Sequence, residues 1–389
     1  MIRGLIKRAK FLLGTQKIWR GPKKSDVLIY DRAGSDVLLP YFRRSSVSIM
    51  DVRNETLNMP VLMMYLIRRY VYKKKSHRYL DEYIKAVSPR VVVTLIDNDE
   101  KFYSIKHRND KVKTIFVQNG IRGGYGDIFE CLNCSNGRKY HVDYMFVFGS
   151  HIANKYREYV SGNPVVIGSF RNNHYKPPEK IAEEKSVLFI SQFRPKPKKR
   201  LFSDEIEDNF SFDKKHQVEK DLVRFLNRYC NEKGLRLQIC GNHMGKLSLE
   251  EYDFYREALG VGDWEFKART KLFSSYEHMV SAGIIVFLFS TLGYEALSRN
   301  KKCVAFCVGG SLDENPGYRF GWPANFPDAG PFWVNRYDEN KFKQLLDNII
   351  RASDEEWASI QTKYVKPLIG FDPGNSKFIG VMKELGVPM

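Results

Sequence analysis

The sequence predicts an α/β protein built from two successive units, each with a parallel sheet. Short, fully apolar segments alternate with segments of helical spacing, which is typical of parallel strands joined by crossover helices. The alternation pauses at a polar stretch that begins with Pro177-Pro178 and then starts again. The chain has 389 residues, enough for two domains at roughly 100–200 residues each.

The first unit spans residues 25–178 and contains runs of β-branched and other apolar residues that end in turn-forming residues. Strands are expected at residues 26–30, 46–50, 90–96, 114–117, 144–148 and 165–167. Helices are expected over residues 60–86 and 151–159, where apolar residues recur at helical spacing.

The second unit spans residues 179–389 and repeats the pattern. Strands are expected at residues 186–190, 235–240, 264–267, 283–289 and 302–307. Helices are expected at residues 214–233, 249–259, 274–281, 291–299, 338–352, 355–363 and 376–385. Residues 308–333 are rich in Gly, Pro and aromatic residues and predict a long loop. Polar residues and glycines follow the strands repeatedly, and in open parallel sheets ligands bind at that edge.

The net charge of +18 predicts a polyanionic partner: nucleic acid, an anionic membrane surface or phosphorylated substrates. Residues 1–24 contain eight basic residues and no acidic one, interspersed with large apolar residues. This mixture is typical of an interfacial amphipathic helix, so this basic leader favours an anionic membrane surface. No segment is long and apolar enough to span a bilayer, and the leader lacks the apolar core of a signal peptide. We therefore expect a cytoplasmic protein, peripheral on the inner face of the membrane.

The most informative segment is Ser290-Thr291-Leu292-Gly293-Tyr294-Glu295, which follows an apolar strand and opens a helix. Ser290 and Thr291 are good helix N-caps, and the free N–H groups of a first turn favour a phosphate. Gly293 would let a ligand approach the backbone closely. Glu295 lies four residues after Thr291, so its carboxylate could accept hydrogen bonds from ribose hydroxyls. The alternative is a capped helix with no ligand, in which Glu295 only interacts with the helix dipole.

The segment from Ser274 through this motif to Lys302-Cys303-Val304-Ala305-Phe306 resembles the nucleotide-binding half of GT-B glycosyltransferases. It is most similar to bacterial transferases that use CMP-activated sugars, such as 3-deoxy-manno-octulosonic acid (Kdo) or sialic acid. The resemblance implies two Rossmann-like domains that face each other across a cleft. It also implies that Ser290 and Thr291 hold the phosphate of the nucleotide.

Further pieces are similar to surface-polysaccharide and O-antigen biosynthesis proteins. They are Tyr30-Asp31-Arg32, Leu95-Ile96-Asp97-Asn98-Asp99, Val117-Gln118-Asn119-Gly120-Ile121-Arg122, Val166-Ile167-Gly168-Ser169 and Phe189-Ile190-Ser191-Gln192. The resemblance implies transfer of a sugar from a nucleotide-activated donor to a cell-surface glycan or lipid-linked acceptor. Ser191, Gln192 and Gly241 follow strands of the second unit, at the edge where ligands bind, and are further candidates to contact the nucleotide.

Three carboxylates follow strands of the first unit and are candidates for the general base: Asp97 and Asp99 are favoured, and Asp31 is the third candidate. Related transferases often have a histidine where this chain has Asn119, and an amide cannot act as a base at neutral pH. Asp97-Asn98-Asp99 also matches a D-x-D metal motif. The GT-B resemblance favours a metal-independent reaction, so no cofactor beyond the nucleotide-sugar co-substrate is expected.

Donor or acceptor phosphates need polar and basic partners, and arginine can bind a phosphate with two hydrogen bonds. The candidates follow strands or lie in the long loop: Gln118, Asn119, Gly120, Arg122, Arg171, Arg194 and Arg319. Ordinary surface arginines are the alternative for the charged members of this set.

Two other functions remain open. A related scaffold could transfer a polyol phosphate from a CDP-linked donor, as in teichoic-acid synthesis. A basic protein could instead bind nucleic acid, but the sequence has no aromatic-and-glycine RNA motif and no zinc finger, so no nucleic-acid partner is expected.

Overall fold

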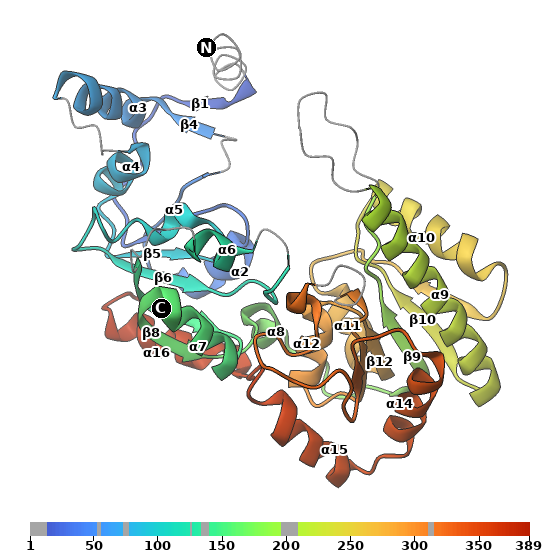
Figure 1. Ribbon diagram of the computed structural model, residues 1–389. Coiled ribbons are helices and arrows are strands. Elements are labelled where there is room, and N and C mark those ends of the chain that lie inside the picture. The colour runs from blue at the N-terminus through green and yellow to red at the C-terminus, as the bar shows by residue number, and fades with distance from the viewer. Residues whose placement is uncertain are drawn as a thin grey trace.

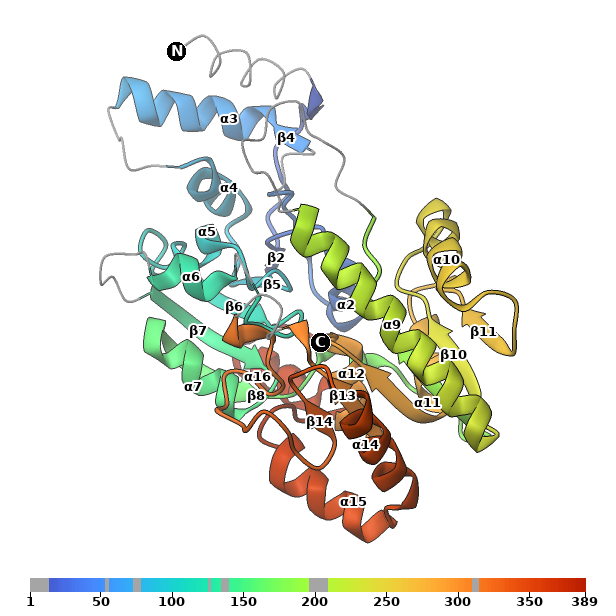
Figure 2. The same cartoon turned by 45° about the vertical axis from the view of Figure 1, so that its right-hand side comes forward.

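The computed structural model describes residues 14–52, 56–72, 78–124, 127–133, 140–195, 209–309 and 315–389, with the side chains of 209–211 not described. It contains two six-stranded sheets in separate lobes of the molecule (Figures 1 and 2). Every strand pair in both sheets is parallel, as the sequence predicts.

The N-terminal sheet has the strand order β3-β2-β5-β6-β7-β8. Its strands are β2 (Val27–Ile29), β3 (Val47–Ile49), β5 (Val91–Thr94), β6 (Lys113–Val117), β7 (Tyr140–Val147) and β8 (Val160–Val166). β2 and β5 are fully buried, which explains their uninterrupted β-branched sequences. The helices of this lobe are α2 (Ser35–Leu38), α3 (Met59–Leu66), α4 (Tyr79–Val87), α5 (Glu100–Tyr103), α6 (Ile128–Asn133), α7 (Ser150–Tyr159) and α8 (Phe170–His174), with the short helical turns η1 (Leu39–Phe42) and η2 (Ile67–Val71).

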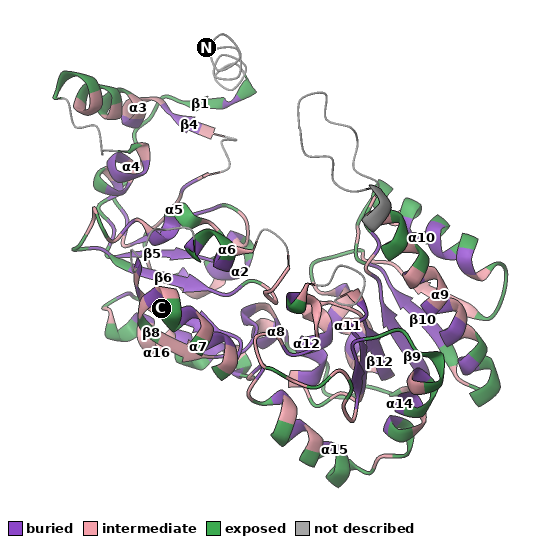
Figure 3. Cartoon of the chain, viewed as in Figure 1, coloured by how far each residue is buried: buried purple, intermediate pink, exposed green. Residues whose placement is uncertain are grey.

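The C-terminal sheet has the strand order β11-β10-β9-β12-β13-β14. Its strands are β9 (Glu184–Ile190), β10 (Arg236–Cys240), β11 (Trp264–Lys267), β12 (Ala282–Phe287), β13 (Cys303–Phe306) and β14 (Trp333–Val334). The helices after β9 are α9 (Asn209–Lys233), α10 (Lys246–Leu259), α11 (Ser274–Ser281), α12 (Thr291–Ser298), α14 (Glu339–Arg351), α15 (Asp354–Ile360) and α16 (Ser376–Glu384), with the turns η3 (Pro316–Tyr318), η4 (Gln361–Val365) and η5 (Pro373–Asn375). Helices of this lobe contact the sheet directly: α9 contacts β9 and β10, and α14 contacts β13 and β14. The buried strands and the exposed outer faces of these helices are visible in Figure 3.

Three local features differ from the expectation. The edge strand β14 begins at Trp333, at the end of the loop expected over residues 308–333. The helix expected over residues 60–86 is two helices, α3 with η2 and then α4. A separate two-stranded sheet joins β1 (Gln16–Ile18) to β4 (Thr56–Asn58). The three residues of β1 are exposed and carry no apolar run, so local sequence gives no strand signal there. Residues 1–13 of the basic leader lie outside the described part of the chain.

The last helix, α16, packs on the N-terminal lobe, although the sequence order places it in the second unit. Phe378 and Met382 are buried in a cluster with Val27, Phe146 and Phe170 of the first lobe. Helix α16, which the expected unit of residues 179–389 includes, therefore belongs to the first lobe in the structure. The apolar face of α16 predicts burial, but the surface that buries it is distant in sequence.

Among the described residues, we find no helix that combines the length and the apolar character needed to cross a bilayer.

Candidate functional site between the two lobes

Each sheet has one topological switch point, which is the place where the chain changes its direction of travel across the sheet. In the N-terminal sheet, β3 and β5 lie on opposite sides of β2, so the switch point lies between β2 and β5. In the C-terminal sheet it lies between β9 and β12 for the same reason. Loops that follow such strands diverge and leave a crevice for ligands. The candidate carboxylates follow β2 and β5, and the Ser290-Thr291 motif follows β12.

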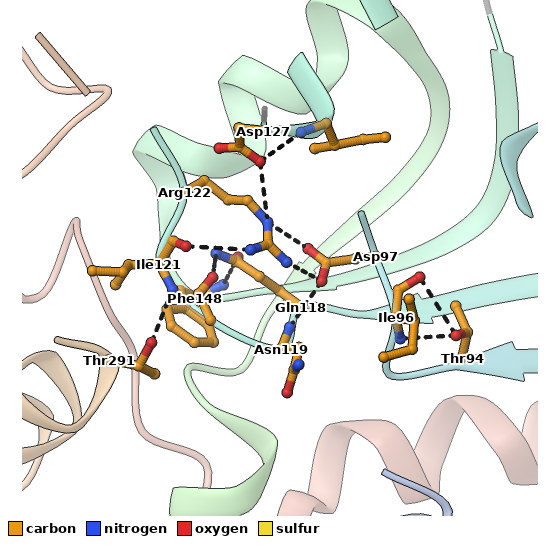
Figure 4. Close-up of polar contacts among 12 residues, drawn as sticks. Thr94, Ile96, Asp97, Gln118, Asn119, Ile121, Arg122, Asp127, Phe148 and Thr291 are labelled. Carbon is orange, nitrogen blue, oxygen red and sulfur yellow. Dashed lines mark hydrogen bonds and ion pairs between the residues drawn. The ribbon is translucent and has the colours of Figure 1, made fainter. Parts of the chain in front are cut away.

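Asp97, after β5, is fully buried and holds the neighbouring loop in place (Figure 4). Its carboxylate accepts hydrogen bonds from the Arg122 guanidinium, from the Tyr156 hydroxyl at 2.8 Å and from the Asn119 backbone N–H at 3.1 Å. Burial alone would lower the pKa of Arg122, but the charge of Asp97 outweighs burial and raises that pKa. Because it is fully buried and already accepts from three groups, Asp97 is a poor acceptor for a substrate proton. Its contacts support a positioning role.

Asp99 is partly exposed, in contrast to Asp97. It caps α5 by accepting from the Lys101 backbone N–H at 3.0 Å, and it accepts from the Tyr30 hydroxyl at 2.9 Å. Asp31 is buried and accepts from the Ala33 backbone N–H at 2.9 Å. Of the three candidates, Asp99 has the most accessible carboxylate.

The loop after β6 is braced internally by Gln118. Its side-chain amide donates to the Gly120 carbonyl at 2.9 Å, while its amide oxygen accepts from the Phe148 N–H at 2.8 Å. Gln118 is buried, whereas Asn119 is exposed. The structure therefore gives Gln118 a shaping function and leaves the Asn119 side chain accessible for a ligand.

The two switch points meet where this loop contacts the start of α12. The Ile121 backbone N–H donates to the Thr291 hydroxyl at 3.2 Å (Figure 4). A Cβ at Gly120 would lie 3.0 Å from the same hydroxyl, so glycine permits the close approach. Ser290 is the N-cap residue of α12, but its side chain makes no capping hydrogen bond. The first turn of any α-helix has N–H groups without an intrahelical acceptor, so this position suits an anion.

Gly293 has a different role from the one expected. A Cβ at this position would overlap the ring of Phe287 in β12. The residue is buried, so glycine here allows α12 to pack on the strand and does not open the backbone to a ligand.

Glu295 also differs from the expectation, because it lies at the contact between the lobes. Its carboxylate is only 3% exposed and accepts from Ser169 of the N-terminal lobe and from the Tyr276 hydroxyl at 3.0 Å. Burial raises the pKa of Glu295 to about 7, although both hydrogen bonds act in the opposite direction. In this arrangement the carboxylate has no surface for a ribose. Asn172 extends the contact, since its side chain donates to Ser298 at 2.9 Å and accepts from Arg299 at 2.5 Å.

The loops after β9 and β10 are organised by two buried glutamates that the sequence analysis missed. Glu251 of α10 accepts from the Ser191 hydroxyl and from the Asn242 and His243 N–H groups, the latter two at 2.8 and 3.0 Å. Glu219 of α9 accepts from the Gln192 N–H at 2.7 Å, and burial raises the pKa of Glu219 to about 7.

The sequence analysis assigns three residues of these loops to the nucleotide, Ser191, Gln192 and Gly241. Of these, only Gln192 has an accessible side chain. Ser191 is buried. A Cβ at Gly241, which is also buried, would lie 2.9 Å from the Phe266 ring. Gly241, like Gly293, is thus required by packing.

The candidate arginines are dispersed. Arg171 of α8 lies 4.0 Å from Asp36, and its charge reaches Glu295. Arg319 forms an ion pair with Asp328, and Arg194 is exposed. Arg122 and Arg319 both line a pocket between the lobes, whose walls are formed by Gln118, Ile121, Arg122, Phe148, His151, Ile152, Phe289, Tyr294, Arg319, Trp322, Pro323 and Leu368. The structure brings these two arginines to one place and leaves Arg171 and Arg194 elsewhere.

The chain therefore has two Rossmann-like domains whose switch points meet, which is the arrangement of the GT-B fold and agrees with the sequence prediction. The solved UDP-GlcNAc 2-epimerase of Methanocaldococcus jannaschii, in complex with UDP-GlcNAc and UDP, has the same fold, with a TM-score of 0.53 at 10% identity over 92% of this chain and 99% of that one. A glycosyltransferase from Rickettsia africae matches with a TM-score of 0.47 at 11% identity over 94% of this chain and 100% of that one. The wall teichoic acid polymerase TagF matches with a TM-score of 0.47 at 11% identity over 92% of this chain and 88% of that one.

The family model described as "putative O-antigen biosynthesis protein" matches residues 115–386, more than half of the chain. The chain belongs to this family. A search of curated proteins finds no sequence match.

Proposed function

We propose that the protein is a glycosyltransferase that moves a sugar from a nucleotide-activated donor to a bacterial cell-surface glycan or lipid-linked acceptor. The observation that carries the proposal is the contact between Thr291 and the Gly120–Ile121 loop, which brings the two switch points together. A donor held by one sheet then lies against an acceptor held by the other. Membership of the O-antigen family supports the choice of a glycan acceptor.

The donor side of the proposed site is the start of α12. Ser290 and Thr291 hydroxyls and the N–H groups of the first turn would bind the phosphate of the nucleotide. We further propose a CMP-linked, Kdo-like donor, because the sequence around this motif resembles transferases of that kind. Gln192, accessible after β9, would contact the nucleoside.

The proposed base is Asp99. The acceptor hydroxyl attacks the anomeric carbon, the bond from that carbon to the phosphate oxygen breaks, the nucleotide leaves, and Asp99 takes the hydroxyl proton. Asp99→Asn should lower kcat by about 10²–10⁴-fold with little change in KM. Asp97→Asn should instead destabilise the fold, because Asp97 holds Arg122 and the Asn119 N–H.

Thermal-shift measurements with CMP, CDP, UDP, GDP and dTDP test the donor side. Stabilisation by CMP above the other nucleotides supports the proposed donor class, and stabilisation by UDP alone contradicts it. Turnover assays with CMP-sugars and CDP-glycerol then distinguish sugar transfer from polyol-phosphate transfer. Release of CMP from CDP-glycerol alone refutes sugar transfer. Salt-dependent binding of nucleic acid without any nucleotide effect refutes the enzyme proposal as a whole.

We place the reaction at the inner face of the cytoplasmic membrane, since nucleotide-activated sugars are cytoplasmic substrates and the basic leader suits anionic lipid. Vesicle binding that survives deletion of residues 1–13 without any loss would contradict a contribution of these residues to membrane binding.

A further inference from the structure

The helical segment formed by α3 and η2 has an apolar face that points to solvent. Its exposed large apolar residues follow the i, i+1, i+3, i+4, i+7, i+8 pattern of a single helix face. They are Met63, Met64, Leu66, Ile67, Tyr70 and Val71. Met63 is 59% exposed and Tyr70 is 69% exposed. A surface helix normally turns this face toward the core, and an exposed apolar patch marks a site of interaction.

Contacts on the opposite face hold the helix against the rest of the lobe, and these contacts set the orientation of the apolar face. Val61 is buried, and α3 contacts α4. Arg68 forms an ion pair with Glu82 of α4 at 2.7 Å, and the Glu82 side chain is only 5% exposed. The Tyr79 hydroxyl accepts from the backbone N–H of Asn58, which is the N-cap residue of α3. These contacts attach the helix by the face that carries Val61 and Arg68, and they leave the face with the exposed apolar residues outward.

The surroundings of this face are basic. Residues 14–24 and 56–72 contain no acidic residue. Exposed basic residues lie in β1, which pairs with β4, and in the segment directly after β1. They are Lys17, Arg20, Lys23 and Lys24. Trp19, between them, is 70% exposed. Figures 1 and 2 show α3, β1 and β4 together at the end of the N-terminal lobe, away from the C-terminal sheet.

We propose that the outward face of α3–η2, with the adjacent residues 17–24, is a docking surface for an anionic lipid bilayer. Apolar side chains that enter the acyl boundary and basic side chains at phosphate depth are the two parts of an interfacial anchor, and both are present. A second copy of this chain fits less well, because it would bring two basic surfaces together. The proposal does not depend on the transfer reaction, and it locates the anchor in a folded element outside residues 1–13.

Co-sedimentation of the full-length protein with vesicles tests the proposal, with no nucleotide or acceptor present. Binding to phosphatidylglycerol vesicles should be at least about tenfold tighter than binding to phosphatidylcholine vesicles. The variant M63Q/M64Q/Y70S/V71Q should weaken phosphatidylglycerol binding by at least about tenfold. All four positions are exposed, so the thermal stability should stay unchanged.

The matched control is L249Q/V261Q, which removes two exposed apolar side chains from the C-terminal lobe and should leave vesicle binding unchanged. Equal loss in both variants, or unchanged binding of the α3–η2 variant, overturns the proposal. Self-association without vesicles that the α3–η2 variant abolishes, combined with no binding to phosphatidylglycerol, assigns the face to a second copy and also overturns it.

Discussion

The buried pair of Asp97 and Arg122 should be the strongest single polar contribution to the N-terminal half of the site. Asp97 has no exposed surface, and the Arg122 side chain is only 11% exposed. Arg122→Met removes the guanidinium donors and leaves the carboxylate with Tyr156 and the Asn119 N–H. Removing one partner of a buried pair costs about 3–5 kcal/mol. At roughly 2–4 °C per kcal/mol, the melting temperature of this lobe should fall by about 6–20 °C.

Asp97→Asn should cost less, because Arg122 keeps a second carboxylate, that of Asp127, at 3.8 Å. The double variant should be more stable than the sum of the two single losses predicts, with a coupling of about 1–3 kcal/mol. The reason is that the double variant leaves neither charge buried alone.

Denaturant unfolding at pH 7 measures the free energies, and hydrogen exchange of peptides over β5 and β6 assigns them to the N-terminal lobe. The control is Arg256→Met, since Arg256 and Asp253 form an exposed pair at 3.0 Å whose loss should cost less than about 1 kcal/mol. A loss at Arg122 as small as that of the control, or strict additivity in the double variant, would refute the assigned role of the pair.

Three further outcomes follow from the site. Because the pKa of Glu295 is raised to about 7, the folded protein holds the Glu295 proton more tightly than the unfolded chain, and stability should fall as pH rises from about 4.5 to 7. Glu295→Gln should remove part of that fall in thermal unfolding scans at pH 5 and 8. An identical change in melting temperature between the two pH values for both proteins would contradict this reasoning. Gly293→Ala should cost about 1–3 kcal/mol through overlap with Phe287, and the added variant Phe287→Leu should recover part of that loss in the same denaturant assay. EDTA should leave transferase activity unchanged, because Asp97 of the D-x-D motif is already engaged by Arg122, and activity that returns only with Mn²⁺ or Mg²⁺ would show otherwise.

The sequence predicts most strands of both sheets because their signal is local, but the two-residue strand β14 is missed. Val91–Thr94 and Ala282–Phe287 are short apolar runs bounded by turns, and each forms a buried strand. The short strand β1 escapes prediction because it is exposed and its pairing partner lies about 40 positions away. Helix α16 is predicted as a helix, but its position on the first lobe depends on distant residues and has no local signal.

The candidate site is predicted at the level of loops and less well at the level of side chains. Asp97, Asp99 and Thr291 follow strands, as expected, and these strands flank the two switch points. Whether a carboxylate is accessible depends on partners elsewhere in the chain, such as Arg122 and Tyr156 for Asp97. Glu219 and Glu251 were missed for a related reason: a glutamate within a helix normally lies on its solvated face.

Buried carboxylates occupy many of the backbone N–H groups that a phosphate would otherwise use. Asp97 takes the N–H of Asn119, Glu219 takes that of Gln192, and Glu251 takes those of the loop after β10. These loops are therefore rigid walls of the site and poor anion sites. The first turn of α12 remains as the proposed anion-binding element, because its N-cap serine makes no capping hydrogen bond and the sequence motif lies there.

The sequence analysis assigns both Ser290 and Ser191 to the nucleotide, but the structure gives the two serines different surroundings. Ser290→Ala should weaken nucleotide binding by about 3–10-fold, roughly the value of one hydrogen bond, without loss of stability. Ser191→Ala should leave the nucleotide Kd unchanged and lower stability by about 1–3 kcal/mol, because the hydroxyl links Glu251 to the Phe193 N–H. Calorimetric titration with the nucleotide that gives the largest thermal shift, paired with denaturant unfolding, measures both quantities. If Ser191→Ala weakens binding while Ser290→Ala does not, the phosphate lies at β9 and the start of α12 is only a helix end.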